Sequence, residues 1–487
     1  MISISPNFKD GYELMHEGAL VLAEIEQTGM RIDVDYCISQ QKHLTRKIER
    51  MERLLHEDSI IKEWKSVYKS EFNLNSNAQL SDMLFVRMQV SHPGATDENP
   101  HPTTVNKETL DALDVPIVKN MLQMRKLKKA RDTYIANLIT ESVDGILHPN
   151  FNLHGVRSFR SASSGPNFQN IPIRDPEIKK AIRRAFIPRD GHVFGGIDYG
   201  SQEVRIACCY HNDPAMLRYL TDPTTDMHRD VAMDCYLIDD PDWVLKPVRQ
   251  EAKGGFTFAQ FYGDYYINSA KNLYAPLLNA NNPLMYGNKN GGPQIPLIEH
   301  LKTKGIITYE DFVEHIRLVE DKFWNERFPV YTQWKKDWKK EYDKNGYFDL
   351  YTGFRCSGFM KKNDVLNYQI QGSAFHCLLW SLIQLHKWLK RSGLKTVIVG
   401  QIHDEAVLDM HENEIEVVLA KCQEIMTVDI VKHWPWITAP LEVEADFCSP
   451  TESWYNKAGM HIPKESFSEL WIKHQQGYQS VYSKCKK

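Results

Sequence analysis

Residues 193–205 read Val-Phe-Gly-Gly-Ile-Asp-Tyr-Gly-Ser-Gln-Glu-Val-Arg, and this stretch decides the fold. Its apolar first half predicts a strand that ends at Asp198. A second strand-like run ends in the same way within residues 397–408, which read Val-Ile-Val-Gly-Gln-Ile-His-Asp-Glu-Ala-Val-Leu and contain Asp404. Two such acids on neighbouring strands could hold a pair of Mg²⁺ ions for phosphoryl transfer. Either acid alone is more typical of a turn cap or a solvated position.

A cationic segment lies between the two acids. Residues 249–263 read Arg-Gln-Glu-Ala-Lys-Gly-Gly-Phe-Thr-Phe-Ala-Gln-Phe-Tyr-Gly. This pattern predicts a helix with Arg249 and Lys253 one turn apart and aromatic side chains beyond them. Such a face could hold a triphosphate by its charges and stack a base or sugar on its rings.

Taken in order, the three segments resemble motifs A, B and C of the family A DNA polymerases. Asp198, Glu203, Arg205 and residues 401–405 fall in register with the family pattern, with Ile402 in place of its Val. Residues 160–172 and 367–374 are similar to the stretches of the family that line the primer-template, and residues 24–33 and 72–80 are similar to its thumb. The resemblance covers roughly residues 17–460.

The resemblance implies an α+β fold of the right-hand polymerase type, with an antiparallel-sheet palm, helical fingers and a helical thumb. The expected regions are 1–148 (thumb and start of the palm), 149–205 (palm with motif A), 206–350 (fingers with motif B and an insertion), 351–460 (palm with motif C) and 461–487 (C-terminal extension).

The resemblance also implies addition of dNTPs to a primer 3′-OH, with release of pyrophosphate and two Mg²⁺ ions per site. Metal ligands would be Asp198, Asp404 and the main-chain carbonyl of Tyr199, which also lies at the nucleotide. Glu405 is either a further catalytic ligand or a hydrogen-bonded neighbour. Arg249 and Lys253 would hold the phosphates, and Lys253 could protonate the leaving pyrophosphate.

Sugar selection is expected from motifs A and B. Glu203 packed under Tyr262 would fill the space of a ribose 2′-OH, so a deoxyribose is expected. Phe258, where other members carry Tyr, predicts discrimination against dideoxynucleotides.

Motif B departs from the family spacing by one extra residue. Lys253 to Phe258 is five residues, and an ideal helix would rotate the aromatic side chains about 100° further from the cations. A π-bulge at the Gly254-Gly255 pair could absorb the residue, which we prefer; alternatively, Thr257 and Phe261 take the inward positions.

Further residues are expected at the DNA. The basic run 125–131 would lie on the thumb, where backbone contacts position a duplex, although such a run is as often a solvated face. His403 is either a tip residue bonded to backbone or a neighbour of the primer terminus. The expected DNA contacts are Arg160, Asn167, Gln169, Asn170, Asn367, Gln371, His403, Lys128 and Lys129.

The composition limits the class of protein to which the chain can belong. With 42% hydrophobic and 25% charged residues, the chain resembles an ordinary globular protein, and it contains no membrane-spanning apolar run. Nine cysteines without a Cys-x-x-Cys pair fit reduced thiols in a cytoplasm (the host's, if a phage encodes the chain), with Cys208 and Cys209 as core residues. Net charge of −4 gives no sign of a nucleic-acid partner.

Partners beyond primer-template DNA and dNTPs stay open. Thumb-like sequence begins within the first twenty residues, so we expect a monomeric polymerase without its own 3′–5′ exonuclease and with any proofreading supplied by a separate exonuclease protein. An insertion at 265–309 and a tail at 462–487 with Trp471, Tyr478 and Tyr482 are either packed appendages or docking sites for a partner such as a processivity factor. A phage replicative enzyme is the expected role, although the sequence does not separate replication from repair. The competing functions are a single-subunit RNA polymerase and a catalytically silent DNA-binding protein.

Overall fold

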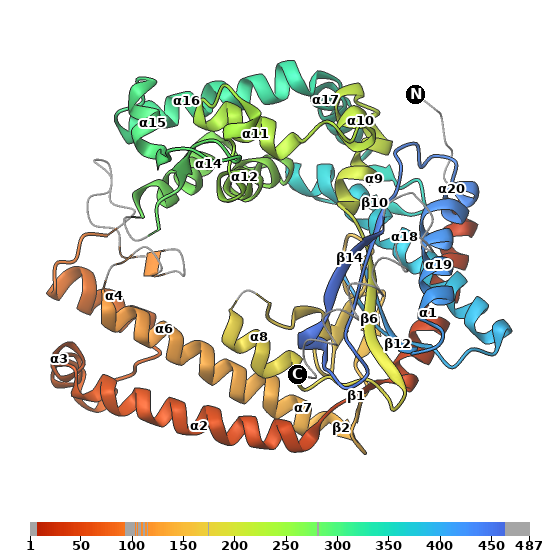
Figure 1. Cartoon of the computed structure of the whole chain (residues 1–487), viewed down its shortest axis with the longest axis horizontal. Coiled ribbons are helices and arrows are strands. Elements are labelled where there is room, and N and C mark those ends of the chain that lie inside the picture. Colours follow the sequence, from red (N-terminus) through yellow and green to blue (C-terminus); the bar gives the residue numbers. More distant parts are fainter. Residues whose placement is uncertain are drawn as a thin grey trace.

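The computed structural model describes residues 7–92, 115–173, 175–279 and 282–462, together with positions 103, 105, 109, 110 and 113. Helices in these residues surround one five-stranded antiparallel sheet, with strand order β11-β12-β6-β13-β14 (Figure 1). The strands are β6 (His192–Tyr199), β11 (Val397–Ile402), β12 (Glu405–His411), β13 (Val443–Phe447) and β14 (Ala458–Ile462). The predicted α+β class and antiparallel sheet are therefore confirmed.

The central strand β6 is buried along nearly its whole length, which explains its continuous apolar sequence. Gly195 and Gly196 lie where neighbouring strands leave no room for a side chain. A Cβ at Gly195 would lie 2.9 Å from the main-chain oxygen of Asp446. The sheet can therefore close tightly around the strand that carries Asp198.

The predicted hairpin of motif C is confirmed, but its connection is shorter than expected. Strands were expected at 396–399 and 406–410, with residues 400–405 between them. The observed pairing continues through Gln401 to Ala406 and Ile402 to Glu405, so only His403 and Asp404 form the turn. His403 has φ of +53°, which lets the chain reverse within two residues.

Three groups of helices are seen in Figure 1. One group covers the sheet: α1 (Phe8–Thr28), α8 (Pro176–Arg183), α9 (Gln202–His211), α18 (Lys362–Ser392), α19 (Ile415–Glu424) and α20 (Ile430–His433). A second lies at the lower left: α2 (Val34–Glu57), α3 (Ser59–Tyr68), α4 (Asn77–Ser81), α6 (Pro116–Lys129) and α7 (Ala136–Glu141). The third lies at the top: α10 (Pro214–Thr221), α11 (Met227–Tyr236), α12 (Lys246–Ala252), α13 (Ala259–Phe261), α14 (Tyr266–Tyr274), α15 (Leu297–Thr303), α16 (Tyr309–Asp321) and α17 (Pro329–Asn345).

Short strands complete the fold. They are β1 (Met30–Arg31), β2 (Ser142–Val143) and β3 (Ile146–Leu147), β4 (Asn150–Asn152) with β5 (Ala162–Ser164), β7 (Met285–Tyr286) with β8 (Ile295–Pro296), and β9 (Tyr347–Asp349) with β10 (Arg355–Ser357). The first helix, α1, packs on α18 and β11, so the chain starts against the sheet before it enters the lower-left group.

The cysteines lie in the core as free thiols, as the sequence predicts. Cys208 and Cys209 are buried, as predicted, and the eight cysteines of the described residues are all free. In the part of the chain that is described, no helix is long and apolar enough to cross a membrane. The tail residues Trp471, Tyr478 and Tyr482 lie outside the described residues, as does nearly all of the segment 93–114.

Candidate active site

The sheet brings the two aspartates of motifs A and C together. Asp198 lies near the end of β6, and its Cα partners are Glu405 on β12 and Glu444 on β13. Asp404 directly precedes Glu405 in the two-residue turn. Two residues that are 206 positions apart in the chain therefore meet at one end of the sheet, as the motifs predict.

The surroundings of the two aspartates disfavour their ionised forms. Burial, followed by the charges of Asp404 and Glu405, raises the pKa of Asp198 to about 7. Burial also raises the pKa of Asp404 to about 6, with Glu203 and Glu405 adding to the effect. Half-buried carboxylates whose pKa values are raised by other acids are a donor set that a hard divalent cation prefers.

The donor set fits magnesium better than a metal held only by protein. Within the described ranges, no cluster of three or more His, Cys, Asp or Glu side chains is arranged to hold a metal. Mg²⁺ is usually held by one or two carboxylates together with substrate phosphates, which matches Asp198 and Asp404. The side chain of Tyr199 is buried and bonded to Ser381, so only its main-chain carbonyl can act at the metal or the nucleotide.

Glu405 faces a different partner. Its carboxylate lies over Gly196 and accepts a hydrogen bond of 2.6 Å from Lys457 Nζ, which also bonds Asp446 at 2.6 Å. The Lys457 side chain is only 4% exposed. Burial alone would lower the pKa of Lys457, but the two carboxylates outweigh it and raise the pKa. Of the two alternatives for Glu405, the geometry favours the hydrogen-bonded neighbour.

Motif B is interrupted where the extra residue was expected. Helix α12 ends at Ala252, a π-helical turn runs over Lys253–Phe258, and α13 follows. The predicted π-bulge is confirmed. Thr257 is fully buried, with its hydroxyl on the carbonyl of Ala252, so the alternative that turns Thr257 into the site is wrong.

The π-helical turn determines where the aromatic side chains of motif B lie. The ring of Phe258 lies 5.1 Å from Lys253 Nζ, and Tyr262 donates a 2.8 Å hydrogen bond to Glu203. Phe261 reaches the cavity wall but packs on the aromatic rings of Phe323 and Phe328. The cations, Phe258 and Tyr262 therefore stay on one side of the helix despite the insertion.

Phe258 and Tyr262 line a cavity of about 420 Å³. Its wall includes Glu203, Tyr262, Phe258 and Asp404. Arg160, expected at the DNA, instead donates a 2.6 Å bond to Glu203 within this cavity. Glu203 is thus held by both Arg160 and Tyr262, in the position expected for a sugar filter.

A polar network supports the turn of motif C. Gln401 accepts hydrogen bonds from Ser161 and Gln169 and donates one to the main-chain oxygen of His403. Gln169 was expected to contact DNA, but its side-chain amide is hydrogen-bonded within the protein. The ring of His403 lines the cavity, and burial, then Arg160, lowers its pKa. This placement favours the second alternative, a His403 beside the reacting end of the substrate.

The other residues expected at the DNA fall into two groups. Asn367 and Gln371 of α18 line the cavity, whereas Asn167 and Asn170 are exposed on the loop before α8. The basic run of α6 does not form one surface. Lys128 pairs with Glu52 of α2 at 2.6 Å, and Lys129 lies over Tyr134. Internal pairing therefore leaves fewer cations for a duplex than the run suggests.

The profile of "DNA polymerase family A" matches residues 35–283 and 321–456. The chain belongs to DNA polymerase family A. It is 28% identical over 454 residues to the thermostable DNA polymerase I of Thermus thermophilus, covering 90% of this chain and 47% of that protein. It is 25% identical over 471 residues to the DNA polymerase of Bacillus phage SP01, covering 85% and 47%. The chain thus spans about half the length of these curated relatives.

The family A fold is also found among solved structures. The polymerase domain of Pol1 from M. smegmatis, solved with DNA primer-template and dNTP, superposes with a TM-score of 0.69 at 22% identity, covering 90% of this chain and 70% of that one. This likeness confirms the right-hand polymerase fold. The family profile skips residues 284–320, which overlap part of the insertion expected at 265–309.

Three residues in or beside the site were missed by sequence reasoning. His228 packs edge-on against Phe258, and its pKa is lowered to about 4 by burial and then by Lys253 and Arg249. Asp226 accepts a 2.7 Å bond from Arg249 Nε. Lys457 is a third missed residue, and nothing around it in the sequence distinguishes it from an exposed loop lysine.

Proposed function

We propose that this chain is a template-directed DNA polymerase that adds dNTPs to a primer 3′-OH and releases pyrophosphate. The observation that carries the proposal is the pair of half-buried, uncompensated aspartates, Asp198 and Asp404, beside the Glu203–Tyr262 contact. The polymerase domain of M. smegmatis, which shares the fold, was solved with primer-template and dNTP. The relative from a Bacillus phage supports a role in phage DNA replication.

Asp198, Asp404 and the Tyr199 carbonyl would hold two Mg²⁺ ions, which supply charge neutralisation at the attacking and leaving oxygens. Arg249 and Lys253 hold the β and γ phosphates, and Lys253 gives a proton to the departing pyrophosphate. When a phosphate of the nucleotide binds Arg249, it takes the place of the Asp226 carboxylate. Glu203, tied to Tyr262, occupies the space of a 2′-OH, and Phe258 disfavours dideoxynucleotides.

The regions act together in this proposal. Residues 149–205 and 351–460 form the palm, 206–350 the fingers and 1–148 the thumb with the start of the palm. Closing of the fingers over a correctly shaped base pair would supply fidelity. Asn367 and Gln371 lie where they could contact the template beside the new pair.

The test is primer extension on a primed DNA template with Mg²⁺, with dNTPs and rNTPs offered in parallel. We expect extension by dNTPs only, a loss of at least about 10³-fold for Asp198→Ala because a metal ligand is removed, and normal extension for Asp190→Ala, an exposed carboxylate ahead of β6. Efficient use of rNTPs would indicate an RNA polymerase instead. Synthesis from neither substrate would indicate a silent DNA-binding protein.

A further inference from the structure

Motif B contains a buried polar side chain that the mechanism proposed above does not use. Gln260 lies in α13, between Phe258 and Tyr262 in the sequence, and is 2% exposed. An amide buried to this degree lowers stability unless its N–H and C=O groups find hydrogen-bond partners. The partners of Gln260 therefore indicate what the residue does.

The amide of Gln260 is bonded at both ends. Its oxygen accepts a 2.8 Å hydrogen bond from Trp324 Nε1. Its nitrogen donates to Glu320 Oε2 at 2.6 Å and to Ser269 Oγ at 3.3 Å. An indole N–H only donates and a carboxylate accepts, so these partners fix which way the amide points. Trp324 belongs to the π-helical turn Lys322–Arg327, Glu320 to α16 and Ser269 to α14, so one amide ties α13 to three separate segments.

The indole that bonds Gln260 is itself held in place. Lys335 of α17 places its Nζ 3.0 Å from the centroid of the Trp324 ring, which is a cation–π contact. Thr332 Oγ1 donates a 2.6 Å hydrogen bond to the main-chain oxygen of Trp324. Tyr331 packs edge-on against the indole, with ring centroids 5.4 Å apart. Gln260 is therefore attached to a fixed partner.

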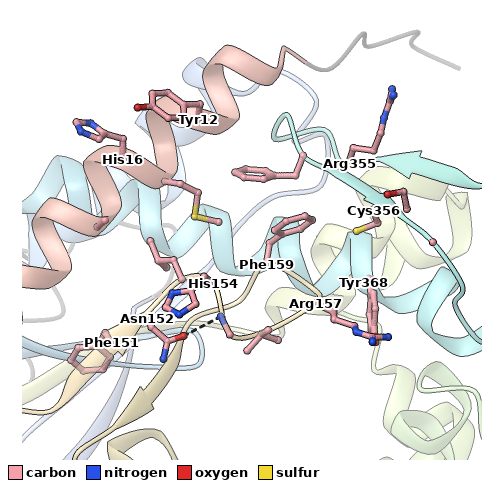
Figure 2. A pocket seen from close by; sticks show the side chains of 18 of the residues that line it. Tyr12, His16, Phe151, Asn152, His154, Arg157, Phe159, Arg355, Cys356 and Tyr368 are labelled. Carbon is pink, nitrogen blue, oxygen red and sulfur yellow. Dashed lines mark hydrogen bonds between the residues drawn. The ribbon is translucent and has the colours of Figure 1, made fainter.

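Gln260 faces away from the catalytic cavity. Tyr262 N donates a 3.0 Å hydrogen bond to Phe258 O, so residues 258–262 form one α-helical turn. In such a turn Phe258 and Tyr262 share a face, and Gln260 lies about 200° around the axis from each. Phe258 and Tyr262 line the catalytic cavity, whereas Gln260 lines another cavity of about 690 Å³. A third groove, of about 1210 Å³, is lined by α1, residues 150–159 and the β10 hairpin (Figure 2). The bonds of Gln260 therefore hold α13 from behind the catalytic cavity.

The rotation of α13 needs such a contact because the helix is very short. It spans Ala259–Phe261 and follows directly on the π-helical turn Lys253–Phe258. One residue more or less in that turn rotates the following side chains by about 100°. Gly263, with φ of +87°, ends the helix on its other side. The rotation of α13 decides whether Tyr262, which is 54% exposed, keeps its 2.8 Å bond to Glu203.

We propose that Gln260 is a positioning residue for sugar selection. It fixes the rotation of α13 against Trp324 and Glu320, and this keeps Tyr262 on Glu203, where the pair fills the space of a ribose 2′-OH. The proposal rests on the polymerase function proposed above. It deepens that function by adding to the sugar filter a residue that acts through Tyr262 from the far side of the helix.

The test compares kcat/KM for insertion of a dNTP with kcat/KM for the rNTP of the same base. Gln260→Leu removes the amide and leaves Trp324 Nε1 and Glu320 without this partner. We expect the dNTP-to-rNTP ratio to fall about 10-fold, the effect of losing one buried hydrogen-bonded contact. A native ratio, or equal losses for both substrates, would show a merely structural role and overturn the proposal.

A swapped pair of side chains supplies the rescue. Gln260→Glu alone brings two carboxylates within hydrogen-bond distance and should also lower the ratio. Adding Glu320→Gln places an amide donor opposite that carboxylate, which still accepts from Trp324, so the double variant should recover the native ratio. A folded double variant with the low ratio of Gln260→Glu would contradict the proposal. This arm decides the question even if Gln260→Leu does not fold.

Gln79 provides the matched control, because its side-chain oxygen also accepts a hydrogen bond from an indole, Trp64 Nε1, at 3.0 Å. It lies in α4, in the lower-left group of Figure 1, and Gln79→Leu should keep the native dNTP-to-rNTP ratio.

Hydrogen exchange of the peptide 259–264, measured without DNA or nucleotide, separates the two proposals. Exchange should be faster in Gln260→Leu and return to the native rate in the swapped pair. A native chain that inserts no nucleotide would show that the proposed function is wrong. Unchanged exchange in Gln260→Leu would show, independently of activity, that Gln260 does not hold α13.

Discussion

At the level of single residues, the carboxylates at the end of the sheet divide into two sets. Glu405 and Asp446 share the buried ammonium of Lys457, which offsets part of their negative charge. Asp198 and Asp404 have no such partner, and the pKa of each is raised. The raised pKa values of Asp198 and Asp404 support the proposed metal site at this end of the sheet.

The raised pKa of Asp198 predicts a stability that depends on pH. The folded chain keeps a proton on Asp198 up to about pH 7, whereas the unfolded chain loses it near pH 4. The stability from this proton is therefore complete below pH 4 and is lost as pH rises through 7. The difference in the free energy of unfolding between Asp198→Asn and the native chain should shift in favour of the variant by about 2 kcal/mol from pH 5 to pH 8. Urea unfolding in EDTA measures this difference.

Asp190→Asn is the control for this experiment, because its exposed carboxylate is paired with Arg31 and its pKa is lowered. The free energy of unfolding of Asp190→Asn should not exceed that of the native chain at pH 8. An Asp198→Asn gain of the same size at both pH values would contradict the charge argument.

Lys457 should stabilise the fold through its two ion pairs. Lys457→Met leaves Glu405 and Asp446 without the ammonium that pairs with both, and breaking a buried pair costs about 3 kcal/mol. Adding Glu405→Gln to Lys457→Met should recover part of that loss in urea unfolding, because one of the two charges is removed. Additive effects of the two substitutions would show that the residues do not interact.

At the level of elements, the π-helical turn of motif B shows how a one-residue insertion is tolerated. Both glycines of the pair lie within the turn, but their surroundings differ. A Cβ at Gly254 would meet nothing within 4 Å, whereas a Cβ at Gly255 would lie 2.9 Å from Leu273 Cδ2 of α14. Gly255 is therefore required for packing, and Gly254 only supplies backbone freedom.

This difference makes a matched pair of variants. Gly254→Ala should stabilise the segment by about 1 kcal/mol, the difference in helix propensity between the two residues. Hydrogen exchange of the peptide 249–262 should then slow about 5-fold. Gly255→Ala should speed exchange of the same peptide, because α14 must move. The same response to both variants would mean that packing against Leu273 does not distinguish the two positions.

At the level of the whole molecule, the active site forms where three parts of the chain meet. The sheet supplies Asp198 and Asp404, the segment before it supplies Arg160, and the helical group at the top of Figure 1 supplies Lys253 and Tyr262. The contact between Tyr262 and Glu203 joins motif B to motif A across 59 positions in the chain.

The sequence by itself determined the family, the antiparallel hairpin of motif C, the meeting of Asp198 with Asp404 and the π-bulge of motif B. These features depend on local pattern: where an apolar run ends, and how residue spacing projects around a helix. Only the tertiary structure decided that Glu405 turns to Lys457, that Arg160 and Gln169 bond within the protein, and that Lys128 pairs with Glu52. A side chain's partner depends on which distant segments pack beside it, and a single sequence does not contain those distances.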